Sequence, residues 1–177
     1  MDFVRPRATP EVSVLQRRRR RLEPPRVWIS AVAAEALADH ADEKLPLETG
    51  GTLLGYWSDG DEVLIQDVTG PGPNAVHERH RFVPDHEWQR ETIAERYDAS
   101  GRITTYLGDW HTHPAGGCTP SERDVRTARA IRQEPAARAP RPMMLILGGG
   151  TDGWRHVLYE LQGRRLRAVD LRQLAQR

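Results

Sequence analysis

The spacing of hydrophobic positions changes along the chain between a helical period and an alternating one, and these changes predict the elements. Three segments have apolar residues at helical spacing behind a residue suited to cap a helix. They are residues 30–43 from Ser30, the stretch that Asp85 begins and Gly101 ends, and residues 121–133 from Ser121. Apolar or alternating stretches predict strands at residues 47–57, 62–68, 103–114, 143–149, 154–161 and 164–171.

The order of these elements contains no repeated strand–helix–strand unit. We therefore expect one α/β domain with a mixed, largely antiparallel sheet flanked by helices. Asp59-Gly60 between the first two strands is typical of a hairpin turn. Loops are predicted at residues 69–74, where Gly, Pro and Asn cluster, and at the Pro- and Ala-rich residues 135–142.

The apolar positions also predict which side of each helix is buried. The first helix presents Val32, Leu37 and several alanines on one face. The second helix is expected to bury Trp88, Ile93, Ala94 and Tyr97. We interpret the tryptophans as core residues rather than as a substrate platform: Trp57, Trp88 and Trp110.

Residues 1–25 differ in composition from the rest of the chain, with four prolines and a run of five arginines. Adjacent arginines repel one another and bury nothing, so we expect a disordered tail at residues 1–25 before a folded domain at residues 26–177. The tail could serve as an arm for nucleic acid or an acidic partner. However, the net charge of +1 creates no overall field that favours nucleic acid or a membrane surface.

The single cysteine, Cys118, excludes an intramolecular disulfide and fits a reducing compartment. The N-terminus has no apolar segment of the kind found in signal peptides. No apolar run approaches the length needed to cross a bilayer. These features predict a soluble, cytoplasmic protein.

The motif His111-Thr112-His113 lies near the end of the predicted strand 103–114. Alternate residues of a strand point to the same side, so the two imidazoles converge while Trp110 and Thr112 face the other way. Pro114 cannot continue the hydrogen-bond ladder, and the strand is expected to end there. The sequence therefore predicts a pair of histidines that can share one metal ion.

Asp124 is the best candidate for a third ligand, because it lies on the first turn of the next predicted helix. Ser121 is three residues earlier, on the same helical face, and the two also resemble a variant capping box. Two histidines and one carboxylate make a three-ligand zinc site with the fourth position open to water. The alternative, Cys118 as a fourth ligand, would leave no room for water.

A base is still needed to accept a proton from water and return it to a leaving amine, and Glu48 is the best candidate. Zinc lowers the pKa of a bound water from about 15.7 to about 7. General acid–base help typically contributes about 10²–10⁴ in rate. Glu48 precedes Gly50-Gly51, where the absent side chains allow close backbone approach.

Taken together, these residues resemble the signature of the JAMM (MPN+) metallopeptidases. That signature is a glutamate, then H-[ST]-H-P, six residues, and S-x-x-D. Here it corresponds to Glu48, residues 111–114, the gap 115–120, and Ser121 with Asp124. The resemblance covers residues 27–165 and implies the JAB/MPN fold, which is cytidine deaminase-like. It also implies that His111, His113 and Asp124 bind Zn²⁺, that Glu48 deprotonates water, and that Ser121 bonds the forming oxyanion or the water.

Within this family the chain is similar to prokaryotic JAB-domain peptidases found beside bacterial ubiquitin-like conjugation genes, including those of antiphage systems. The segments that resemble them are LETGGTLLGYW, TGPGPNA, RFVPDHEWQ and YLGDWHTHP. The resemblance implies an isopeptidase that cleaves after the C-terminus of a ubiquitin-like modifier, with adjacent activating and conjugating enzymes as further partners. It also places a substrate-contacting insertion at residues 71–102, where a packing helix is the alternative.

Three other functions remain open from the sequence. The chain could release an amino acid or tail from a sulfur-carrier-type ubiquitin-like protein, act as a non-catalytic scaffold, or bind nucleic acid through its tail. The remaining histidines have no partner at ligand spacing and are interpreted as surface or satisfied polar residues: His40, His77, His80, His86 and His156.

Overall fold

The computed structural model describes residues 24–58 and 61–174. The prediction of a disordered tail concerns residues that lie almost entirely outside this range, and the predicted Asp59-Gly60 turn lies outside it too. The described residues contain three α-helices and one short 3₁₀ turn: α2 (Ala31–Glu43), α3 (His86–Ala99), α4 (Glu122–Gln133) and η1 (Pro135–Ala137). None of these helices combines the length and apolar character needed to span a lipid bilayer.

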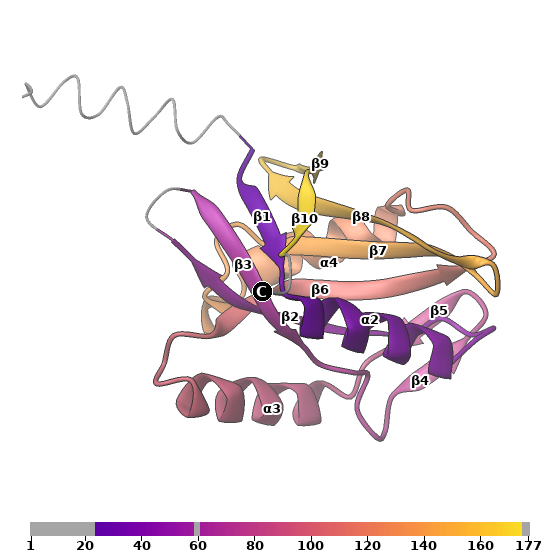
Figure 1. The fold of residues 1–177 in the computed structure, drawn as a ribbon, viewed down its shortest axis with the longest axis horizontal. Coiled ribbons are helices and arrows are strands. Elements are labelled where there is room, and N and C mark those ends of the chain that lie inside the picture. Colours follow the sequence, from indigo (N-terminus) through magenta and orange to yellow (C-terminus); the bar gives the residue numbers. More distant parts are fainter. Residues whose placement is uncertain (1–23, 59–60, 175–177) are drawn as a thin grey trace, which may run out of the picture.

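One eight-stranded sheet forms the centre of the molecule (Figure 1). Parallel pairing joins β1 to β10, β1 to β3, and β6 to β7, whereas the other neighbours are antiparallel. The expected mixed, largely antiparallel sheet is confirmed. Its strands, in spatial order, are β10 (Leu171–Gln173), β1 (Arg26–Ile29), β3 (Glu62–Val68), β2 (Gly50–Trp57), β6 (Thr105–Pro114), β7 (Met143–Gly150), β8 (Gly153–Gln162) and β9 (Arg165–Val169).

The two edge strands of this sheet, β9 and β10, are separated in the chain by Asp170 alone. One residue spans only about 3.5 Å, so the sheet curls until its edges lie side by side, as Figure 1 shows. The prediction of one strand over residues 164–171 was therefore wrong at its end. The chain leaves one edge at Asp170 and joins the other, where β10 pairs with β1.

The sheet is covered on both faces, and successive residues of β7 alternate between the two buried clusters that lie on those faces. Met143, Leu145 and Leu147 belong to the larger buried cluster, which contains Leu37 of α2. Met144 and Ile146 belong to a smaller cluster with Ala128 of α4. The larger cluster also includes Trp110, which confirms the prediction that this residue lies in the core. Val32 is 72% exposed, so its predicted place on the buried face of α2 was wrong.

Helix α3 forms at the predicted place, but its apolar side chains are less buried than predicted. Asp85 accepts a hydrogen bond from the Trp88 amide at 3.2 Å, and Gly101 follows the helix end at a φ of 68°. Ala94 is exposed, Trp88 is only half-buried, and the buried residue of the helix is Gln89. The helix lies at the side of the sheet (Figure 1), so it has no wide core to cover.

A short hairpin of β4 (Val76–Glu78) and β5 (Arg81–Val83) forms a separate two-stranded sheet. Three-residue strands are too short to show alternation, and the sequence did not predict them. The loop predicted at residues 69–74 is confirmed, and it leads from β3 into this hairpin. The hairpin lies beside the segment that precedes β2, where Glu48 is located.

Candidate metal centre

Strand β6 brings His111 and His113 together at its end. Their Nε2 atoms are 3.1 Å apart, with the rings at 62° to each other. Trp110 and Thr112 are each 1% exposed on the other side of the strand, as the alternation predicts. The strand ends at Pro114, also as predicted.

Helix α4 supplies a carboxylate to the same point. Ser121 caps the helix, and Asp124 is the third residue of its first turn. The Asp124 Oδ1 atom lies 3.4 Å from the His111 Nε2 atom. One ligand atom each from His111, His113 and Asp124 lies within 4.8 Å of the others, among the residues that the structure describes.

Two of the three separations between these atoms are close to those expected around a tetrahedral metal ion. Zinc ligands at bond lengths of about 2.0–2.2 Å lie about 3.3–3.6 Å from one another around a tetrahedron. The observed separations of 3.1 and 3.4 Å are close to that range. The His113 Nδ1 atom lies 3.0 Å from the Gly117 carbonyl oxygen, so Nδ1 donates and Nε2 keeps its lone pair for a metal.

The Cys118 thiol is not among these clustered ligand atoms and instead donates to the Arg155 carbonyl at 3.3 Å. The alternative in which a thiolate closes the metal site therefore disagrees with the structure. A metal ion held by His111, His113 and Asp124 alone would keep one position for water or substrate, which is the arrangement of a catalytic rather than a structural site.

Asp124 is ionised over the whole physiological range. Burial opposes its ionisation, but the hydrogen bond and charge of His111 and the Ser121 backbone N–H outweigh that effect. Together they lower the pKa of Asp124 from 3.8 to about 2. A carboxylate that is always charged is suited to bind a cation.

Glu48 lies just before β2 and lines a cavity of about 400 Å³ together with both histidines, Asp124 and Ser121. Burial raises the pKa of Glu48, and the nearby His113 and His111 only partly offset that rise. A carboxyl group with a raised pKa accepts and returns a proton more readily near neutral pH. The structure therefore brings all five residues singled out from the sequence to one cavity.

Two hydrogen bonds tie the Glu48 segment to β6. The Thr49 amide donates to the Thr112 hydroxyl at 3.0 Å, and the Thr112 amide donates to the Thr49 carbonyl at 2.8 Å. Gly50 pairs with His111 in the ladder. A residue 63 positions away in the sequence is thus placed against the histidine pair by strand register.

Asp109 is a further carboxylate of this cavity that the sequence analysis did not single out. It accepts a hydrogen bond from the Tyr106 hydroxyl at 2.6 Å, and burial raises its pKa. The alternation of side chains along the strand could have identified it, because Asp109 is two residues before His111 and so faces the same side of β6. Phe82, His80 and His86, from the unpredicted hairpin and the start of α3, also line the cavity.

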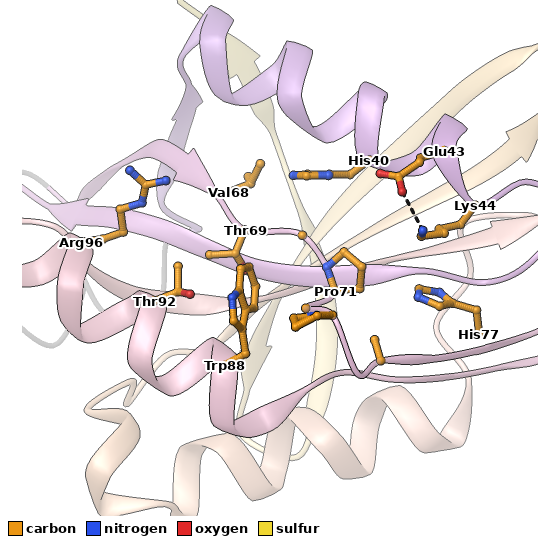
Figure 2. A pocket seen from close by; sticks show the side chains of 14 residues that line it. His40, Glu43, Lys44, Val68, Thr69, Pro71, His77, Trp88, Thr92 and Arg96 are labelled. Carbon is orange, nitrogen blue, oxygen red and sulfur yellow. Dashed lines mark hydrogen bonds and ion pairs between the residues drawn. The ribbon is translucent and has the colours of Figure 1, made fainter.

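A second cavity, of about 520 Å³, lies between α2 and α3 (Figure 2). Its polar side chains come from different elements, with His40 on α2, Lys44 directly after α2, His77 on β4, and Trp88 on α3. His40 stacks on Trp110 with ring centroids 6.2 Å apart. This cavity is larger but contains none of the three clustered ligand residues.

Several known proteins are similar to this chain. Residues 30–159 match the family model described as prokaryotic homologs of the JAB domain. A probable metalloprotease, y4qB, of Sinorhizobium fredii is 45% identical over 132 residues, which are 74% of this chain and 80% of that protein.

Two further relatives match a smaller part. A CD-NTase/cGAS isopeptidase of Enterobacter hormaechei is 31% identical over 60% of this chain and 58% of its own length. The ubiquitin carboxyl-terminal hydrolase RPN11 of Saccharomyces cerevisiae is 29% identical over 60% of this chain and 34% of its own. The chain therefore covers less than two thirds of these two relatives.

The fold is also similar to a solved structure. The solution structure of protein DSY2949 from Desulfitobacterium hafniense superposes with a TM-score of 0.65 at 20% sequence identity. The match covers 85% of this chain and 94% of the other. At this identity the likeness concerns the fold alone.

Proposed function

Because this chain belongs to the prokaryotic homologs of the JAB domain and is a JAMM-type metallopeptidase, we propose that it is a zinc-dependent isopeptidase. Its substrate would be a protein joined to a target through its C-terminus. The observation that supports this most directly is the convergence of His111, His113 and Asp124 in a cavity that also contains Glu48.

We assign the metal as Zn²⁺, held by His111, His113 and Asp124. Two imidazoles and a carboxylate are a common zinc donor set. When bound, the ion would make water a stronger acid and would polarise the carbonyl of the bond to be cut. The hydrogen bond from His113 Nδ1 to the Gly117 carbonyl would leave Nε2 of that ring as the metal ligand.

Glu48 and Ser121 handle the proton and the developing charge. Glu48, with its pKa raised by burial, accepts a proton from water and returns it to the leaving amine. Ser121 lies at the N-terminus of α4 in the same cavity, where its hydroxyl can donate to the oxyanion. Loss of one such donor typically costs about 10²–10³ in turnover.

The names of the relatives support the substrate class. One is called a CD-NTase/cGAS isopeptidase and another a ubiquitin carboxyl-terminal hydrolase. Both names describe release of a protein or modifier from a conjugate. We extend this to a bacterial conjugation system of the antiphage type, in which the conjugated protein is ubiquitin-like or a nucleotidyltransferase and adjacent enzymes attach it.

The test is cleavage of two fusions, one joining the C-terminus of a CD-NTase to green fluorescent protein and one joining ubiquitin to it. We expect zinc-dependent cleavage at the junction of at least one fusion, loss of cleavage with chelator, and recovery on adding Zn²⁺. Glu48→Gln should be inactive on the same fusion.

Equal cleavage by Glu48→Gln would overturn the proposal, and so would cleavage that persists in chelator. Cleavage of neither fusion, with removal of a short tail from a sulfur-carrier-type protein instead, would assign the alternative function.

A further inference from the structure

We propose that His77 is a positioning residue for Glu48. The hydrogen bond from its ring to the Glu48 carbonyl sets where the Glu48 carboxyl lies relative to the metal ligands. This inference rests on the proposed function, in which Glu48 transfers the proton. His77 belongs to the β4–β5 hairpin, which is not part of the main sheet.

Both backbone groups of Glu48 are held by β4. Its amide donates to the Glu78 carbonyl at 2.9 Å, and its carbonyl oxygen lies 2.9 Å from the His77 Nδ1 atom. Glu48 precedes the first residue of β2. The hairpin therefore takes the place of a neighbouring strand at this residue.

The contact with the carbonyl fixes the proton on the His77 ring. A carbonyl oxygen only accepts hydrogen bonds, so Nδ1 must be the donor. The remaining ring nitrogen, Nε2, is then free to face the second cavity, which His77 lines (Figure 2). His77 lines that cavity rather than the metal cavity, so it acts on the reaction only through Glu48.

The hairpin and β6 hold the Glu48 segment from two sides. The His77 ring packs on its cross-strand partner Phe82 with centroids 5.5 Å apart. Phe82 in turn lies so close to Gly50 that a Cβ there would be 2.7 Å from its ring. From the other side, Thr112 bonds both backbone groups of Thr49. Glu48 thus has little freedom to move away from the metal ligands.

This arrangement separates two tasks. The metal ligands are placed by β6 and α4, whereas the proton-transferring carboxyl is placed by β6 together with the hairpin, which alone contributes His77. A defect in the His77 contact should therefore slow the reaction without releasing the metal. A general structural defect would instead lower stability and metal content together.

The experiment compares His77→Leu with His77→Asn. Leucine keeps apolar bulk but has no donor, whereas the asparagine amide can donate from about the position of Nδ1. For His77→Leu we expect kcat to fall by about 10- to 100-fold with little change in KM, because small displacements of a catalytic group have effects of this size. Zinc content should be unchanged, and His77→Asn should recover most of the activity.

Hydrogen exchange of the Glu48 amide gives a result that does not depend on any substrate. In His77→Leu this amide should exchange about tenfold faster, as expected for loss of one supporting hydrogen bond. Amides of α4 should keep their rates, and His77→Asn should match the wild type. If no fusion is cleaved by any variant, the proposed function fails while exchange still decides the positioning role.

Three outcomes would overturn the inference. The first is unchanged Glu48 exchange and unchanged kcat in His77→Leu. The second is an equal defect in both variants, which would mean that the hydrogen-bond donor is not what matters. The third is a fall in the thermal midpoint of His77→Leu with faster exchange throughout α4.

Discussion

Ser121 and Asp124 hold each other in place at the start of α4. The Asp124 carboxylate accepts from the Ser121 amide at 2.6 Å, while the Ser121 hydroxyl accepts from the Asp124 amide at 3.3 Å. This reciprocal pair is a capping box. The helix cap and the candidate centre therefore share the same two side chains.

Replacing Ser121 should reveal both roles. Ser121→Ala removes the cap, which typically lowers the free energy of unfolding by about 1 kcal/mol. It also removes the proposed oxyanion donor, so kcat should fall by about 10²–10³. Denaturant unfolding and steady-state cleavage measure the two effects. Ser121→Thr keeps the hydroxyl and serves as the control. A fall in kcat in Ser121→Ala that the loss of folded protein alone accounts for would contradict the catalytic role.

Glu48→Gln should lower the cleavage activity and raise the stability of the folded protein. The raised pKa of Glu48 means that the folded protein disfavours its charged form. At a pH above the pKa of Glu48 in the folded protein, its carboxylate lowers the free energy of unfolding. Below the pKa of about 4.3 in the unfolded chain, Glu48 is as neutral as the glutamine of the variant, and the difference in stability vanishes. The metal-free Gln variant should therefore be more stable than the wild type at pH 7 but not at pH 4, as thermal unfolding would show. Cleavage should fall by about 10²–10⁴.

Removal of the metal should lower stability as well as stop cleavage. At a free metal concentration of about 100 times Kd, binding contributes about 2.7 kcal/mol. For a chain of this size that corresponds to about 5–10 °C in the thermal midpoint. Chelation should produce this shift, and Zn²⁺ should reverse it.

The same shift should be absent in His113→Ala, which lacks one proposed ligand. His156→Ala is the matched control, because His156 is exposed on β8 and outside the cluster. Elemental analysis should find zinc in the control and little in His113→Ala. Full zinc content in His113→Ala would remove this residue from the ligand set.

Gly51→Ala should destabilise the fold near the centre. A Cβ on Gly51 would lie 1.9 Å from the Thr69 carbonyl oxygen, which also accepts a hydrogen bond from the Trp110 indole at 2.9 Å. Overpacking of this kind typically costs about 1–3 kcal/mol, measurable by denaturant unfolding. Gly117→Ala is the control, since a Cβ there meets nothing within 4 Å. Equal stability of the two variants would contradict the close approach at Gly51.

The sequence predicted the parts of the site that depend on short spacing. His111 and His113 converge because they are two residues apart on a strand, and Asp124 lies on the first turn of α4 because Ser121 caps that helix. These relations are local and follow from the geometry of one strand and one helix turn. The position of Glu48 is different, because it depends on the register between β2 and β6.

The hairpin and the support of Glu48 could not be predicted in this way. Three-residue strands give no periodic signal, and the contact between His77 and Glu48 joins positions 29 residues apart. The limited burial of α3 was missed for a related reason. Ala94 and Trp88 have apolar side chains, but whether a helix face is covered depends on where the helix lies against the sheet.

The junction of the sheet edges at Asp170 has a consequence for how the chain folds during its synthesis. β1 lies between β3 and β10, so its pairing is incomplete until residues 171–173 have left the ribosome. Until then the nascent chain presents an open strand edge to other proteins. Completion of the sheet also needs contacts between distant parts of the chain, which slows folding. A chain stalled before Leu171 should therefore be a preferred client of chaperones.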